Sequence, residues 1–176
     1  MKKQCNLLVV AMLLLFSSNA QLNLKASLPF DAKTKTGKLS NGLTYYIRQN
    51  QKPENKVELR LVVNAGSILE DKDQQGLAHF TEHMAFNGTR NFKKNELVNF
   101  LQSIGVEFGA DLNAYTGFDE TVYILPIPLT DTANYRKGMQ VLQDWASGIS
   151  FDNKQIDEER SVILEESRLG KGAEDR

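Results

Sequence analysis

The spacing of the two histidines is the feature that most constrains this chain. His79 and His83 are the only histidines in the sequence. They lie in a segment, residues 74–86, whose apolar residues recur at helical spacing. Four residues make about one helical turn, so a helix projects both imidazoles from one face. We therefore predict a helix over residues 74–86, ended by Asn87-Gly88.

The chemistry of this helix face is that of a metal site. Two imidazoles one turn apart can bind one Zn²⁺ at about 2.0–2.1 Å each, and a third ligand and a water complete a tetrahedron. The metal lowers the pKa of that water to about 7. Glu82 shares a side of the helix with His79 and can act as a general base on the water. The alternative is a pair of surface or packed histidines beside an unrelated glutamate, but the combined spacing favours the metal site.

The third ligand has to be a carboxylate. No histidine remains, and the one cysteine, Cys5, lies in the N-terminal segment discussed below. The best candidates lie in the acidic stretch at residues 156–166, where Glu159 and Glu166 are seven apart and share a helix face. Glu165 points about 100° away from Glu166. One carboxylate of this face could bind the metal while the other supports a ligand histidine. The spacing alone does not show which of Glu159 and Glu166 would bind the metal and which would support the histidine. The alternative for this stretch is a solvated acidic helix.

The N-terminus has the layout of an export signal. Two lysines precede an apolar run at residues 7–16, and small residues follow at 18–20. This predicts a signal peptide over residues 1–20, cleaved after Ala20, and a periplasmic or secreted protein. The alternative is a membrane anchor, but ten apolar residues are too few for the roughly 20 that span a bilayer. Residues 21–38 are expected to form an extended leader.

Composition excludes several function classes. Hydrophobic residues make up 41% of the chain and charged residues 24%, as in a soluble globular domain. The formal net charge is −1, so no basic field exists to bind nucleic acid. A single cysteine also excludes a disulfide framework.

The remaining pattern mixes strands and helices. It predicts an α+β fold, a mixed or antiparallel sheet with helices packed on one face. An Asn-Gly turn predicts a hairpin before a strand at residues 43–48. The other expected strands are 57–63 and 121–127, the latter ending near Pro126, and the other expected helices are 93–104, 133–147 and 152–169. The expected buried positions include Leu77 on the first helix and Met139 on the third.

With these residues in view, the sequence resembles the insulinase/pitrilysin family of zinc metallopeptidases, and its bacterial exported members most closely. Residues 76–89 match the family's metal helix, which has the H-x-x-E-H order of inverted zincins. Residues 109–116 match its Asn-Ala-Tyr-Thr segment, and residues 159–166 match its third-ligand helix. The resemblance implies that residues 39–176 are the N-terminal part of a catalytic zinc peptidase domain.

The resemblance also implies a role for each site residue. His79, His83 and Glu166 would bind one Zn²⁺ per catalytic site. Glu82 would be the base that activates water. Glu159 would be the supporting carboxylate that orients a ligand histidine.

Substrate contacts follow from the same resemblance. Asn113 and Ala114 would lie beside an edge strand that pairs with extended peptide, a mode in which main-chain hydrogen bonds supply the affinity. The alternative for these two residues is a turn.

The resemblance covers part of a larger enzyme. Active family members bring two or more such domains together around a chamber, so a second homologous domain or subunit is the expected partner. The predicted function is a zinc-dependent endopeptidase acting on peptides or unfolded segments. The alternatives are a noncatalytic peptide-binding subunit, an inactive fragment that needs further domains, or an exported metal-sequestering protein. Neither nucleic acid nor a membrane span after signal cleavage is expected.

Overall fold

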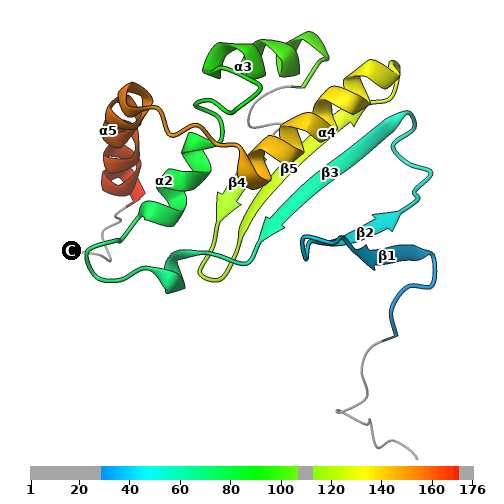
Figure 1. The fold of residues 1–176 in the computed structure, drawn as a ribbon, viewed down its shortest axis with the longest axis horizontal. Coiled ribbons are helices and arrows are strands. Elements are labelled where there is room, and N and C mark those ends of the chain that lie inside the picture. The colour runs from blue at the N-terminus through cyan, green and yellow to red at the C-terminus, as the bar shows by residue number, and fades with distance from the viewer. Residues whose placement is uncertain (1–28, 107–112, 171–176) are drawn as a thin grey trace, which may run out of the picture. The chain divides into compact units, whose positions relative to one another are not determined.

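The computed structural model describes residues 29–106 and 113–170 (Figure 1). The predicted signal peptide and the first part of the predicted leader lie outside the described residues. The chain forms two compact units, divided after Gln51. Each unit is described by itself.

The first unit contains an antiparallel hairpin. Strand β1 (Thr34–Lys38) pairs with β2 (Thr44–Arg48). The turn contains Gly42 at φ 94°, a left-handed conformation that glycine adopts at little cost. Asn41 Oδ1 accepts the Leu43 N–H at 3.1 Å and closes the turn. The predicted Asn-Gly hairpin is confirmed, and β1 occupies the end of the segment expected to be a leader.

The second unit is built on a three-stranded antiparallel sheet in the order β3-β5-β4. Strand β3 spans Lys56–Val63, β4 spans Asn113–Thr116 and β5 spans Thr121–Pro128. β5 is central, and its Leu125 and Ile127 are fully buried. Both strands expected in this unit are confirmed.

The strand expected over residues 121–127, with its end near Pro126, extends one residue further, to Pro128. Pro126 lies within β5 and faces Glu58 on β3. β4 pairs with β5 only between Thr121 and Ile124. Pro126 therefore has one neighbouring strand among the described residues, an environment in which a missing N–H is tolerated.

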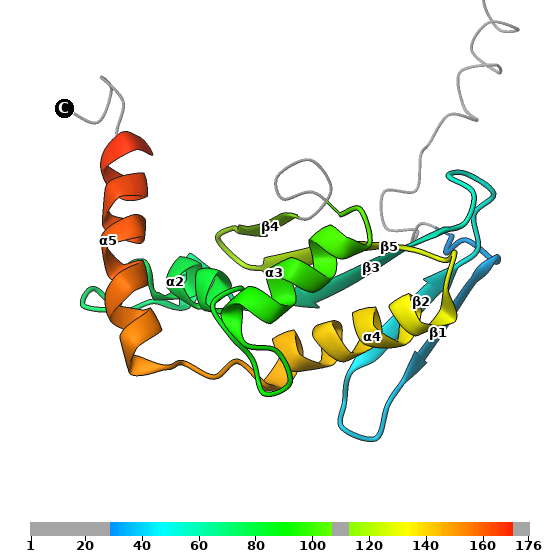
Figure 2. The ribbon, with the colours of Figure 1, turned by 90° about the horizontal axis from the view of Figure 1, so that it is seen from above.

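Helices α3 (Lys94–Ser103) and α4 (Thr132–Ser147) cover one face of this sheet (Figure 2). Their apolar sides meet the sheet in a single core. The α+β architecture with helices on one face is therefore confirmed. The core of the unit contains Leu61, Ala85, Phe92, Leu97, Phe100, Leu101, Val106, Tyr123, Leu125, Ile127, Val141 and Trp145.

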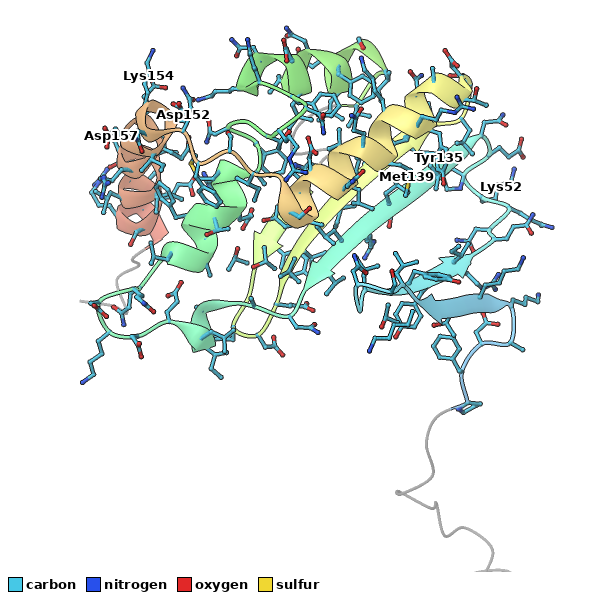
Figure 3. All side chains as sticks on the ribbon, viewed as in Figure 1. Lys52, Tyr135, Met139, Asp152, Lys154 and Asp157 are labelled. Atoms are coloured by element: carbon cyan, nitrogen blue, oxygen red, sulfur yellow. The ribbon has the colours of Figure 1, made fainter. Side chains whose placement is uncertain are left out.

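Helix α4 approaches the sheet through a glycine. A Cβ on Gly138 would lie 2.7 Å from Ile127 Cγ1, so only glycine permits this spacing. The buried stripe of α4 runs through Gly138, Val141 and Trp145. Met139, marked on α4 in Figure 3, was expected inside but is 41% exposed. It lies one residue, about 100° of rotation, away from Gly138.

Two further helices carry the candidate site. Helix α2 (Leu77–Met84) begins three residues later than expected because Gly76 has a left-handed backbone at φ 92°. Leu77, expected to be buried, is 53% exposed at this helix start. Helix α5 (Asn153–Gly170) begins after Asp152, whose Oδ1 accepts two backbone N–H groups of its first turn. Figure 3 marks Asp152 at this helix start.

Within the described part of the chain, no helix combines the length and apolarity needed to cross a membrane.

Candidate metal centre

The two histidines of α2 face each other at their Nε2 atoms. His79 Nε2 and His83 Nε2 are 3.2 Å apart. The rings are nearly perpendicular, with centroids 4.6 Å apart and an interplanar angle of 87°. Helical spacing alone brings the two nitrogens to one point on the α2 surface.

A carboxylate from α5 completes this group. Figures 1 and 2 both show α5 beside α2. Glu166 Oε2 lies 3.6 Å from His79 Nε2 and 3.4 Å from His83 Nε2. Among the described residues, His79, His83 and Glu166 form a group able to hold a metal ion.

The three donor atoms fit a tetrahedral zinc ion. Their separations are 3.2, 3.4 and 3.6 Å. Bonds of about 2.1 Å in a tetrahedron place ligand atoms about 3.4 Å apart. Two imidazole nitrogens and a carboxylate oxygen are also a donor set that zinc accepts in catalytic sites.

Glu159 occupies a different position from Glu166. Its Oε1 lies 2.8 Å from His83 Nδ1, and its Oε2 accepts a hydrogen bond from Asn87 Nδ2 at 2.6 Å. A histidine that donates from Nδ1 to a carboxylate presents the unprotonated Nε2 on its other side. The structure thus separates the two carboxylates that spacing left interchangeable: Glu166 faces the Nε2 atoms, and Glu159 faces Nδ1.

Glu82 is nearly buried, at 7% exposure, beside this group. The Thr116 hydroxyl donates to Glu82 Oε2 at 2.6 Å. Glu82 and His79 line a cleft of about 430 Å³ together with Ser67, Glu70, Gly76, Ala114, Tyr115, Thr116 and Gly117. Burial, and secondarily the charge of Glu82, raises the pKa of the nearby Tyr123 hydroxyl, so this phenol stays neutral.

The predicted substrate contacts lie on β4, one of the two edge strands of the described sheet. Asn113 and Ala114 are the first two residues of β4 and pair with Ile124 and Tyr123 of β5. They lie in a strand and not in the turn considered as the alternative. Ala114 lines the cleft that contains Glu82.

Sequence reasoning missed three polar residues around the site. Thr116 contacts Glu82, and it lies in the segment matched by resemblance. Asn87 binds Glu159, and its position four residues after His83 was a usable signal. Glu70 accepts the N–H groups of Gly76 and Ala78 at 2.9 and 2.7 Å, and so caps the start of α2, whose N-cap residue Gly76 has no side chain that could do so. A cap six residues before Gly76 leaves no local sequence signal.

An α+β layer with the H-x-x-E-H order on one helix and an acidic third donor on another is typical of the class of inverted zincins. The comparison with family models agrees, since residues 45–169 match Insulinase (Peptidase family M16). The chain belongs to this family.

Similar proteins are known in both sequence and structure. The chain is 40% identical over 168 residues to a "Probable zinc protease PqqL" of Haemophilus influenzae, and 39% identical over 173 residues to the Escherichia coli protein of that name. These matches cover 96% and 98% of this chain and 18% of each relative. A crystal structure of the first half of the periplasmic protease PqqL from Escherichia coli matches 85% of this chain and 32% of its own, at 41% identity and a TM-score of 0.79.

Proposed function

We propose that this chain carries the zinc site of an endopeptidase that hydrolyses peptides or unfolded segments. One observation carries the proposal. His79 Nε2, His83 Nε2 and Glu166 Oε2 converge at zinc-like spacing beside the cleft that contains Glu82.

Each residue has a distinct task in this proposal. His79, His83 and Glu166 hold the zinc, and Glu159 keeps His83 in the tautomer that binds it. Zinc, when bound, supplies Lewis-acid polarisation of the scissile carbonyl and a lowered pKa for water. Glu82 removes a proton from the attacking water and passes it to the leaving amine. The hydrogen bond from Thr116 fixes the orientation of the Glu82 carboxylate.

The sheet offers the binding surface for an extended substrate. β4 is one of the two edge strands of the described sheet, in the order β3-β5-β4, and a peptide can extend a sheet at such an edge through main-chain hydrogen bonds. Asn113 and Ala114 are the β4 residues assigned to this contact. Main-chain recognition admits many sequences, so it suits a peptidase that acts on unfolded segments.

The proposed activity belongs to a larger assembly. The chain spans 18% of the length of the two PqqL relatives. We assign residues 39–176 to the N-terminal part of a catalytic domain, and a second homologous domain or subunit completes the chamber. We also assign residues 1–20 to a signal peptide cleaved after Ala20, which would export the protein, as the periplasmic location named for the Escherichia coli relative suggests.

The test measures zinc content and cleavage of a quenched fluorescent peptide mixture by the full chain and by Glu82→Gln. Stoichiometric zinc in both proteins, with cleavage by the unchanged chain alone, supports the endopeptidase. Zinc in both without cleavage supports the alternative, a noncatalytic peptide-binding subunit or a fragment that needs further domains. The observation in favour of this alternative is that the chain spans only 18% of the length of the Haemophilus influenzae relative. Absence of zinc from the unchanged chain refutes the proposal.

A further inference from the structure

The segment after α2, the exit loop (residues 88–92), is paired with the segment that leads into α5. Arg90 N–H donates to Gly148 O at 2.7 Å, and Ser150 N–H donates to Gly88 O at 3.1 Å. Thr89 and Ile149 form an antiparallel bridge between these hydrogen bonds. The chain leaving one ligand helix and the chain entering the other therefore form one short ladder.

A buried carboxylate on α4 anchors the exit loop. Asp144 is 1% exposed. Its Oδ2 accepts from Thr89 Oγ1 at 2.7 Å and from the Asn91 N–H at 2.9 Å, and its Oδ1 accepts from Asn91 Nδ2 at 2.8 Å. A buried carboxylate is costly unless its oxygens are hydrogen-bonded. All three side-chain bonds come from the exit loop, so the loop conformation and the burial of Asp144 depend on each other.

The next residue of α4 holds the end of α2 itself. Trp145 Nε1 donates to Ala85 O, the carbonyl at the C-terminal cap of α2, at 3.0 Å. The Trp145 ring also packs against Phe86 and Tyr123. Two consecutive side chains of α4 thus fix where α2 ends and where the exit loop begins.

Helix α5 needs such support because it buries little apolar surface. Glu159 is its one buried residue, and Ile156 and Ile163 are only half-buried. Hydrophobic packing therefore does little to set the position of α5 along α2. A metal site tolerates displacements of only about 0.5 Å, so polar contacts and the ladder have to supply the placement.

We propose that Asp144 is a positioning residue of the metal centre. Asp144 fixes the exit loop. Because residues 148–150 pair with this loop and lead directly into α5, the loop also sets the position of α5 and brings Glu166 to His79 and His83. Asp144 itself touches none of these three ligands. The inference rests on the proposed function, because it assumes that the three residues bind a metal.

The test measures zinc affinity of the full chain by chelator competition, and the visible absorption of bound Co²⁺ as a report on coordination geometry. In Asp144→Asn an NH₂ donor group replaces one of the two acceptor oxygens, so at least one N–H or O–H donor of the exit loop loses its acceptor. Thr89→Val removes the hydrogen bond to Asp144 and the one that Thr89 Oγ1 accepts from the Phe92 N–H within the exit loop, and Thr89→Ser keeps both. The control Val141→Ala removes buried volume from the same helix one turn earlier, where the side chain cannot bond to the loop.

We expect zinc affinity to fall roughly tenfold in Asp144→Asn and in Thr89→Val, the lower end of the effect of losing a partner outside the ligand set. Thr89→Ser should restore it, and the Co²⁺ spectrum should shift only in the two weakened variants. Val141→Ala should lower stability and leave affinity unchanged. Thr89→Val carries the test if Asp144→Asn does not fold.

Three results overturn the inference. Asp144→Asn and Thr89→Val could bind zinc as tightly as the unchanged chain. Alternatively, Val141→Ala could weaken binding as much as they do, which would make the effect one of general stability. Failure of the unchanged chain to bind zinc refutes the proposed function itself and removes the inference with it.

Discussion

Replacing Glu159 with glutamine tests how the metal centre is supported. Both carboxylate oxygens of Glu159 accept a hydrogen bond, one from His83 Nδ1 at 2.8 Å and one from Asn87 Nδ2 at 2.6 Å. An amide offers one acceptor, so in Glu159→Gln one of these donors must face an NH₂ group. The side chain is only 12% exposed, so water replaces the lost partner poorly. A hydrogen bond to a charged group contributes about 1.5–3 kcal/mol, which corresponds to roughly 10- to 100-fold weaker zinc binding.

The matched control lies on the same helix. Glu165 pairs with Arg168 on the exposed side of α5, with Oε1 and Arg168 Nη2 2.6 Å apart. Glu165→Gln therefore makes the same chemical change away from the histidines, and we expect it to leave zinc affinity unchanged. Chelator competition at neutral pH measures the affinity of each variant, and elemental analysis measures the zinc content.

Glu166→Gln separates a ligand from a supporting residue. We expect it to abolish stoichiometric zinc, while Glu159→Gln retains one zinc ion at lower affinity. Equal affinities for Glu159→Gln and Glu165→Gln would refute the supporting role. Loss of zinc from Glu159→Gln with retention in Glu166→Gln would show that the two carboxylates have the opposite roles.

Three further predictions concern stability. Glu70→Ala should lower the free energy of unfolding by about 1–2 kcal/mol, because Glu70 caps the start of α2; urea denaturation checks this, and the exposed Asp73→Ala should have no effect. In Gly138→Ala, overpacking against Ile127 should cost about 1–3 kcal/mol, and the gain in helix propensity should offset roughly 1 kcal/mol of that, so the net change in stability should be a loss of up to about 2 kcal/mol; a more stable variant in urea would contradict this. Burial raises the pKa of Tyr123, so the folded chain keeps a proton that the unfolded chain releases above about pH 10. The free energy of unfolding should therefore fall as pH rises beyond that value, and Tyr123→Phe should lose less stability over the same range; equal losses would contradict the assignment.

The spacing of apolar residues along the sequence predicted most of the fold, because buried side chains recur about every 3.6 residues in a helix and every second residue in a strand. The helices expected at 93–104 and 133–147 were correct to within one residue at each end. The differences came from tertiary contacts. Pro126 continues a strand because β4 ends its pairing early, and Met139 is exposed because α4 approaches the sheet through Gly138. Neither fact can be inferred from the flanking sequence.

The candidate site divides in the same way. The spacing of His79 and His83 places both on one helix face, so the structure was expected to bring them together. Periodicity also placed Glu159 and Glu166 on one face of α5. It could not show which of the two carboxylates lies at the Nε2 atoms of the histidines and which lies at Nδ1 of His83. That depends on how far α5 is shifted along α2. Contacts across long sequence separations, such as Thr116 with Glu82, were beyond any local pattern.

Helix α2 has only eight residues, too few to be stable alone in water. It exists because Glu70 caps one end and Trp145 binds a carbonyl at the other. Zinc fingers, by contrast, are unfolded until their metal arrives. In this chain α2 is held by contacts from the rest of its unit, and Glu166 lies on α5, so an isolated peptide containing only α2 should bind zinc far more weakly than the whole unit. Under the proposed function, zinc at roughly 100 times its Kd would stabilise the folded chain by about 2.7 kcal/mol by mass action. The same coupling means that local opening at either end of α2 would release the metal.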